Sequence, residues 1–243
     1  MARRQGTAGR GGADPVSGIK AVSFDLDGTL IDSVPDIAAA LNRTLAAAGR
    51  PGLAIPDVVR LIGGGARQLV AHALGGETPE PLSDRLHAEF LATYEAEPVV
   101  RTRPYAGARE ALAELSAQGF KLAICTNKPA RLTHIILEAL DLTSPFSAVW
   151  AGEPDKPLKP DPVCLLTVCA ALDVPPAAAV MVGDSHADVA AALASGCPSV
   201  LVRNGYETRA LESLGAGAIV DDLTQLAAAL PALAARTKRI ALE

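Results

Sequence analysis

Short apolar runs rich in β-branched residues alternate along this chain with longer segments whose apolar residues recur at a helical period. The runs are typical of buried strands, and the helical period is typical of amphipathic helices. Their alternation predicts βα units joined into a parallel sheet. Strands are expected at residues 20–24, 121–125, 148–150, 178–182, 199–202 and 218–220. Helices are expected at residues 107–117, 130–140, 162–172, 187–195 and 223–234.

One interval departs from this alternation. About 95 residues separate the first predicted strand from the second, far more than a βαβ crossover needs. At its start, Ser33 and Asp36 have the spacing of a capping box, which indicates the beginning of a helix. The helical patterns in this interval cover residues 33–49, 57–62, 66–74 and 81–96, with no convincing strand among them.

The predicted fold class is therefore α/β. A doubly wound, Rossmann-like core with a parallel sheet is expected from residues 19–32 and 104–243. A small all-helical domain, residues 33–103, is expected as an insertion after the first strand. Residues 1–18, which contain three arginines among glycine and alanine, are expected to form a flexible tail.

Composition excludes several classes of protein. Hydrophobic residues make up 49% of the 243 residues and charged residues 20%, as in ordinary globular proteins. A net charge of −5 and only 3% aromatic residues argue against nucleic-acid binding. No apolar stretch reaches the length of a membrane span, and no secretory signal follows the N-terminal arginines. The four cysteines form no CxxC pair. We expect a cytoplasmic protein, monomeric or homodimeric, without membrane partners.

Two carboxylates, Asp25 and Asp27, directly follow the first predicted strand. Residues two apart in extended backbone project to the same side, so both would face the ligand-binding edge of an open α/β sheet. A solvated turn is the alternative, because aspartate and glycine are common in turns. A calcium loop does not fit, because the sixth position from Asp25 is Leu30 rather than glycine and the twelfth is Asp36 rather than glutamate.

Polar side chains also lie at other predicted strand ends. These are Thr126 and Asn127 after the second strand, Lys159 ahead of a helix, and Asp184 with Asp188 after the fourth strand. Each is weak evidence alone, since Asp184 and Asp188 also have the pattern of a helix cap with a first-turn acid. All carboxyl ends of a parallel sheet lie at one edge, however, so the set should converge. Carboxylates, a hydroxyl and an ammonium together suit Mg²⁺ and a phosphate.

These motifs, in their order along the chain, resemble those of the haloacid dehalogenase superfamily, and within it the phosphoglycolate phosphatases. They are Asp25-Leu26-Asp27-Gly28-Thr29, Thr126-Asn127, Lys159-Pro160, and Gly183-Asp184 with Asp188. The resemblance covers residues 19–230, and the helical insertion falls where members of this superfamily carry a cap domain. Relatives that cleave carbon–halogen bonds do not keep the second aspartate, so Asp27 favours a phosphotransferase.

The resemblance implies a magnesium-dependent phosphatase of a small phosphorylated metabolite, with 2-phosphoglycolate as the leading candidate. It implies that Asp25 is the nucleophile that forms an aspartyl-phosphate and that Asp27 is the general acid and base. Mg²⁺ is expected on the Asp25 and Asp184 carboxylates and the Asp27 backbone carbonyl. Open alternatives are a sugar-phosphate phosphatase, a pyrophosphatase, a nucleotidase, a phosphosugar mutase and, from another class, a non-catalytic binding module.

The remaining roles concern the phosphate and the rest of the substrate. The resemblance implies that Thr126, the Asn127 backbone N–H and Lys159 bind the phosphoryl group, and that Asp188 orients Lys159 or metal-bound water. Lys156-Pro157 is a competing lysine motif, but the residues after Lys159 lead into a helix start. In the predicted cap, Arg67 after three glycines is a candidate for gripping a substrate carboxylate, with a solvated side chain as the equal alternative.

Overall fold

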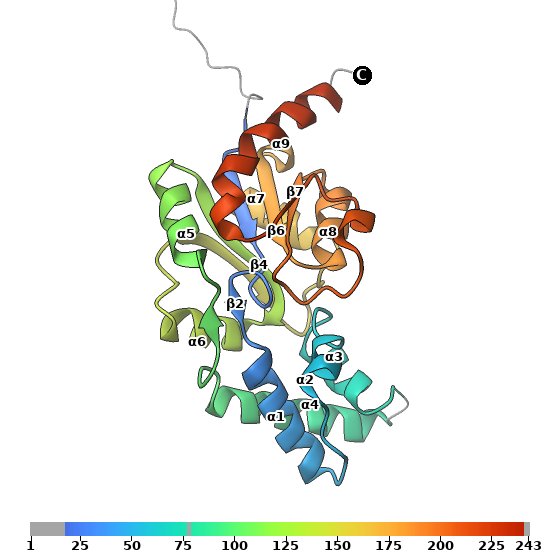
Figure 1. Ribbon diagram of the computed structural model, residues 1–243. Helices are drawn as coiled ribbons and strands as arrows, with labels where there is room; N and C mark the ends of the chain where they lie inside the picture. Colours follow the sequence, from blue (N-terminus) through green and yellow to red (C-terminus); the bar gives the residue numbers. More distant parts are fainter. Residues whose placement is uncertain (1–17, 77–78, 241–243) are drawn as a thin grey trace, which may run out of the picture.

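The computed structural model describes residues 18–76 and 79–240, so the predicted tail lies, except for Gly18, outside the described residues. A six-stranded sheet forms the larger part of the molecule (Figure 1). Every neighbouring pair of its strands is parallel, in the order β5-β4-β1-β6-β7-β8. The strands are β1 (Ala21–Phe24), β4 (Lys121–Pro129), β5 (Phe146–Gly152), β6 (Ala179–Gly183), β7 (Ser199–Val202) and β8 (Ala218–Val220).

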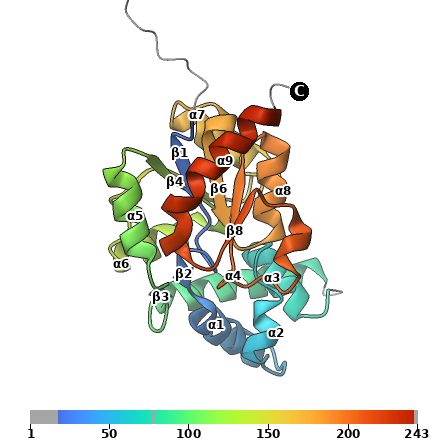
Figure 2. The ribbon, with the colours of Figure 1, turned by 45° about the horizontal axis from the view of Figure 1, so that its top comes forward.

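Helices cover both faces of this sheet (Figure 2). Alternate residues of β1 point to opposite faces: Val22 and Phe24 join one buried cluster and Ala21 joins another. The first cluster contains residues of α5 (Ala108–Ala117), α6 (Ala130–Ala139) and α9 (Leu226–Ile240). The second contains residues of α7 (Val163–Ala171) and α8 (His186–Ser195). The predicted doubly wound α/β core is confirmed.

Four helices lie between β1 and α5 in the described part of the chain. They are α1 (Val34–Ala47), α2 (Ile55–Val59), α3 (Ala66–Ala73) and α4 (Glu80–Ala96), and we call residues 34–96 the helical insert. Within its described residues the insert contains no strand. Two short strands flank it, β2 (Ile31–Asp32) and β3 (Arg103–Pro104), and they pair antiparallel. The insert therefore leaves and rejoins the core through one narrow ribbon (Figure 1).

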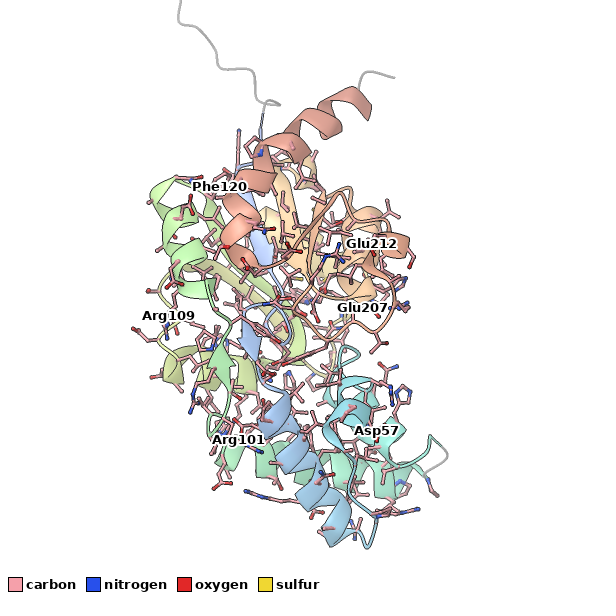
Figure 3. All side chains as sticks on the ribbon, viewed as in Figure 1. Asp57, Arg101, Arg109, Phe120, Glu207 and Glu212 are labelled. Atoms are coloured by element: carbon pink, nitrogen blue, oxygen red, sulfur yellow. The ribbon has the colours of Figure 1, made fainter. Side chains whose placement is uncertain are left out.

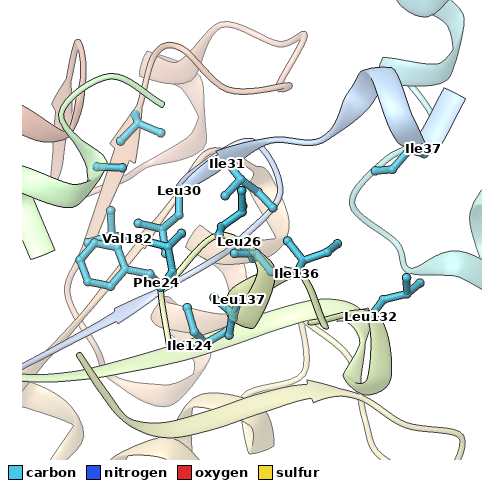
Figure 4. Close-up of a cluster of buried hydrophobic side chains, with 14 of the residues drawn as sticks. Phe24, Leu26, Leu30, Ile31, Ile37, Ile124, Leu132, Ile136, Leu137 and Val182 are labelled. Carbon is cyan, nitrogen blue, oxygen red and sulfur yellow. The ribbon is translucent and has the colours of Figure 1, made fainter. Parts of the chain in front are cut away.

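One apolar cluster continues from the sheet into the insert (Figure 4). Phe24 and Val182 come from neighbouring strands, Leu26 from the loop after β1, Ile31 from β2 and Ile37 from α1. All five are at most 4% exposed. The loop that carries Asp25 and Asp27 is therefore packed between the sheet and the first insert helix.

None of the helices in the described ranges is both long and apolar enough to cross a membrane.

The predicted capping box at the start of α1 is wrong. Ser33 is the N-cap, but its hydroxyl makes no capping bond and instead donates to Asp27 Oδ1 at 2.5 Å. The Asp36 carboxylate accepts the backbone N–H groups of Arg101 and Thr102, at 2.8 and 2.7 Å from Oδ2. The Thr102 hydroxyl donates to the same oxygen at 2.7 Å. Asp36 thus joins α1 to the segment that returns to the core.

Replacing Asp36 with asparagine should destabilise the protein by about 2 kcal/mol, because a buried charged acceptor of several hydrogen bonds is lost. Burial alone would raise the pKa of Asp36, but hydrogen bonds from Thr102, Arg101 and Val100 hold that pKa below its usual value. A lowered folded-state pKa stabilises the fold above the unfolded value of about 3.9. The difference in unfolding free energy between D36N and wild type should therefore shrink as the pH falls below about 4.

Urea unfolding at pH 7 and at pH 3 measures this effect. Asp57→Asn is the matched control, because Asp57 is a first-turn acid of another insert helix but is half exposed and paired only with Arg60. Exposed pairs contribute about 0 to 1 kcal/mol. Equal losses in D36N and D57N would contradict the role of Asp36.

Candidate active site

The loop after β1 is built for close contact with the end of β6. The Asp25 backbone N–H donates to the Val182 carbonyl at 2.9 Å, which continues the pairing of the two strands by one residue. Gly28 has a φ of +84°, and a Cβ there would lie 2.4 Å from Asp184 Oδ2. Only glycine combines this backbone conformation with that approach. The Asp-Leu-Asp-Gly sequence therefore places Asp25 beside Asp184.

Three carboxylates from two strand ends meet at this edge of the sheet. Carboxylate oxygens of Asp25, Asp184 and Asp188 lie within 4.8 Å of one another. Asp184 accepts the Tyr206 backbone N–H at 2.6 Å and the Thr29 hydroxyl at 3.2 Å. Burial, the Asp188 charge and the Asp25 charge raise the pKa of Asp184 well above its usual range. The structure thus brings together the aspartates that the strand-end pattern predicts.

Lys159 lies within this cluster. Its Nζ is 3.0 Å from Asp25 Oδ1 and 2.6 Å from Asp188 Oδ1. The Asn127 side chain holds the lysine backbone, since its Oδ1 accepts the Lys159 N–H at 2.7 Å and its Nδ2 donates to the Lys159 carbonyl at 2.9 Å. By contrast, Lys156 pairs with Glu153 at 2.6 Å, outside the cluster.

Asp188 itself is fixed at the start of α8. Its Oδ2 accepts the Ser185 backbone N–H at 3.0 Å and the Ser185 hydroxyl at 2.6 Å, which is part of a capping box. A Cβ on Gly183 would lie 2.2 Å from the Asp188 carboxyl carbon, so this position also requires glycine. The N-cap of α8 is Ser185 rather than Asp184, while Asp188 is the first-turn acid and directs its other oxygen to Lys159.

Asp27 has partners that the sequence did not indicate. Lys128 Nζ lies 2.9 Å from Asp27 Oδ1 and 3.0 Å from Oδ2, and it donates to the Tyr94 hydroxyl at 3.0 Å. Ser33 donates to the same carboxylate. Lys128 directly follows Thr126-Asn127 at the end of a strand, and this position was its only signal in the sequence. Tyr94, on α4, gave no signal beyond a helical apolar pattern.

A cavity of about 540 Å³ lies over these residues. Thr126, which is buried, lines it together with Asp25 and Asp27. The insert contributes α2, the glycine loop before α3, and Phe90 and Tyr94 of α4 to its wall. In Figure 3, Glu207 marks the core side of this boundary and Asp57 marks the insert. The cavity therefore lies between the sheet edge and the helical insert.

A family model described as haloacid dehalogenase-like hydrolase matches residues 19–196, which include the whole carboxylate and lysine cluster and the helical insert. The chain belongs to the haloacid dehalogenase-like hydrolase family. Curated relatives named phosphoglycolate phosphatase come from Rhodospirillum rubrum, 40% identical over 85% of this chain and 89% of the relative, and Agrobacterium fabrum, 38% identical over 85% and 90%.

Solved structures agree with this assignment. A predicted phosphoglycolate phosphatase from Haemophilus somnus matches with a TM-score of 0.80 and 29% identity, over 86% of this chain and 97% of that one. Because its curated relatives are named phosphatases and its family is one of hydrolases, this haloacid dehalogenase-like hydrolase is a phosphoric monoester hydrolase.

The cluster in this haloacid dehalogenase-like hydrolase fits a divalent cation. Burial raises the pKa of Asp25 to about 6, because the nearby Lys159 charge only partly offsets desolvation and the neighbouring Asp188 and Asp27 charges. Asp25 Oδ1 is buried and accepts no hydrogen bond of good geometry from the described residues. Hard carboxylate oxygens with excess negative charge are the ligands that Mg²⁺ prefers.

Arg67 does not join the other candidate residues. It pairs with Asp84, its side chain is 64% exposed, and it is absent from the described lining of the cavity. Arg60 and Arg209 line the cavity in its place. The rotation of α3 about its axis decides which side chain faces the cavity, and Gln68 rather than Arg67 does so.

Two further contacts tie the site of this haloacid dehalogenase-like hydrolase to the insert. The Asn127 side chain, besides holding Lys159, donates to the Gly63 carbonyl of the insert loop at 2.8 Å. The Tyr206 hydroxyl accepts the Ser33 backbone N–H at 2.8 Å, while the Tyr206 backbone N–H contacts Asp184. The sequence around Tyr206 predicts only a turn, so its link between the carboxylate cluster and the start of α1 was missed.

Proposed function

We propose that this protein is a magnesium-dependent phosphatase that acts on a small phosphorylated metabolite, 2-phosphoglycolate above others, through an aspartyl-phosphate intermediate. One observation carries the proposal. Asp25 lies at the wall of the cavity with Lys159 Nζ 3.0 Å away, and Asp27 lies two residues further along the same loop. A nucleophile, a positive charge and a proton carrier therefore face one space.

In the first step the Asp25 carboxylate attacks phosphorus. The new bond joins phosphorus to the Asp25 oxygen, and the bond from phosphorus to the substrate oxygen breaks. The departing oxygen keeps the bonding electrons and takes a proton from Asp27. Lys159, the Thr126 hydroxyl and the Asn127 backbone N–H bind the phosphoryl oxygens, which offsets the repulsion between two anions.

In the second step water attacks the phosphorus of the aspartyl-phosphate. Asp27, which has given up its proton, now takes one from the water, and the bond between phosphorus and the Asp25 oxygen breaks. Inorganic phosphate leaves and both carboxyl groups return to their starting states. One residue can serve both steps because each moves a proton on the same side of the phosphorus.

Mg²⁺ would be held by the Asp25 and Asp184 carboxylates and the Asp27 backbone carbonyl. When bound, it supplies positive charge that stabilises the phosphoryl oxygens in the transition state. Asp188 keeps the Lys159 ammonium beside Asp25 through its 2.6 Å contact. This chain thus divides its four site carboxylates between chemistry, metal binding and orientation of the lysine.

The substrate assignment depends on the helical insert, which we propose acts as a cap over the cavity. The volume of about 540 Å³ suits a small molecule. Arg60 and Arg209 on the lining, which are more than half exposed, favour an anionic substrate beyond its phosphate. Relatives of 38 to 40% identity are named phosphoglycolate phosphatases, which supports 2-phosphoglycolate as that substrate.

Phosphate release from a panel of substrates tests this proposal. The panel contains 2-phosphoglycolate, hexose phosphates, pyrophosphate and nucleoside monophosphates, each with Mg²⁺ and with chelator. We expect kcat/KM for 2-phosphoglycolate to exceed the others by about 100-fold, or roughly 2.7 kcal/mol, and chelator to abolish it. A flat profile would contradict the substrate. Turnover that survives the chelator would contradict the metal, and isomerisation of a hexose phosphate without phosphate release would indicate a mutase.

A further inference from the structure

Lys128 is a buried cation that pairs with the proposed acid. Its side chain is 2% exposed, and its Nζ lies within 3.0 Å of both oxygens of Asp27. By contrast, Arg60 and Arg209 of the described cavity lining are more than half exposed, and they pair with Asp57 and Glu207. A buried ammonium is costly unless it is paired and hydrogen-bonded. Lys128 is therefore placed to act on one group, the Asp27 carboxyl.

The helical insert holds Lys128 in this position. Tyr94 of α4 accepts a hydrogen bond from Lys128 Nζ at 3.0 Å, and its ring centroid lies 4.7 Å from the same atom. Tyr94 is 2% exposed and packs against Phe90, with ring centroids 5.8 Å apart. The phenol is thus fixed by the packing of α4, and it contacts the ammonium through both its oxygen and its ring face.

These contacts connect three side chains from three parts of the molecule in series. Tyr94 comes from the insert, Lys128 from the end of β4, and Asp27 from the loop after β1. The Asp27 side chain is 13% exposed and lies on the cavity wall. Its carboxyl must present one oxygen to the departing group, so the direction in which it points affects proton transfer. Two nearly equal contacts with Lys128 fix that direction.

We propose that Lys128 and Tyr94 are positioning residues, which together orient the Asp27 carboxyl for proton transfer to the leaving group. Helix α4 of the insert, which carries Tyr94, thereby contributes to general acid catalysis. This inference rests on the proposed role of Asp27 as general acid. Neither residue contacts the reacting phosphorus in this scheme. The competing interpretation is that the pair only stabilises the packing of the insert on the core.

Leaving-group dependence separates the two interpretations. An alkyl phosphate such as 2-phosphoglycolate or ethyl phosphate releases a strongly basic oxygen and needs a proton from the acid. Release of 2,4-dinitrophenolate does not, because that anion is stable in water. The quantity compared is kcat/KM, which reports transfer to Asp25 before the later hydrolysis step contributes. Loss of acid function lowers kcat/KM for alkyl phosphates alone, whereas general damage to the site lowers it for both.

The experiment measures kcat/KM for ethyl phosphate, 2-phosphoglycolate and 2,4-dinitrophenyl phosphate in Asp27→Asn, Lys128→Met and Tyr94→Phe. General acid catalysis contributes about 10² to 10⁴, so D27N should lose at least about 100-fold on the alkyl phosphates. We expect K128M to lose about 30-fold and Y94F about 10-fold on the alkyl phosphates, with changes under about threefold on the dinitrophenyl ester. Thr44→Val is the matched control, because Thr44 is a buried insert hydroxyl that bonds only within α1.

Each outcome bears on one statement. Equal losses on both kinds of substrate in K128M and Y94F, or no loss on the alkyl phosphates, would overturn the positioning role while D27N still supports the acid. If D27N shows no leaving-group dependence, the proposed role of Asp27 fails and the inference fails with it. Should K128M not fold, Y94F decides, because it removes a single oxygen and keeps the ring over Lys128.

Discussion

Replacing Asp25 with asparagine should lower kcat/KM by at least about 10⁴-fold, or roughly 5 kcal/mol of transition-state stabilisation. Asparagine keeps the size of the side chain and its place beside Lys159, but an amide oxygen is too weak a nucleophile to form an acyl-phosphate bond. The same change should leave the melting temperature equal or higher. Burial raises the pKa of Asp25 to about 6, so the fold holds this charge at a cost that the neutral amide removes.

The opposite signs of these two effects distinguish a catalytic residue from a structural one. Kinetics with 2-phosphoglycolate and Mg²⁺, together with a thermal melt of the same samples, measure both. Asp173→Asn is the control: Asp173 is an exposed carboxylate in the turn after α7, and its loss should change neither quantity. D25N that kept more than about a tenth of wild-type activity would contradict nucleophilic catalysis by Asp25.

The core fold was predictable because most of its strands contain short runs of buried apolar residues. The predicted strands at residues 199–202 and 218–220 coincide with β7 and β8. The strand predicted to end at Cys125 instead continues to Pro129, which pairs with Gly152 of β5. Pairing between distant segments leaves no local pattern, and the two-residue strands β2 and β3 are too short to show any period. Sequence patterns thus locate the elements better than their ends.

The same reasoning explains which site residues could be found. Asp25, Asp184 and Lys159 meet because parallel strands bring their carboxyl ends to one edge, a rule that needs no knowledge of side-chain packing. Tyr94 and Tyr206 reach the site only because α4 and the loop after β7 pack against it. Such contacts depend on the rotation and docking of whole elements, which a hydrophobic period does not determine. The capping-box pattern failed for the same reason, since tertiary partners captured both of its side chains.

Removing the ammonium of Lys159 should lower kcat/KM by about 10³-fold. Lys159→Met keeps most of the volume of the side chain but leaves Asp25 and Asp188 without their shared counter-ion, at 3.0 and 2.6 Å in the wild type. Three neighbouring carboxylates would then repel an anionic substrate, so KM should rise as kcat falls. The protein should also lose stability, because breaking a buried ion pair typically costs about 3 to 5 kcal/mol.

Lys156→Met is the matched control, because it makes the same substitution three residues earlier in the competing Lys-Pro motif. Lys156 is 39% exposed, pairs with Glu153 and lies 5.0 Å from the centroid of the Trp150 ring. K156M should keep kcat/KM within about twofold of wild type and lose at most about 1 kcal/mol of stability. A larger loss of activity in K156M than in K159M would mean that the substrate phosphate is bound by Lys156. The comparison therefore tests the geometry of the strand-end cluster itself, since the two lysines differ in position and not in chemistry.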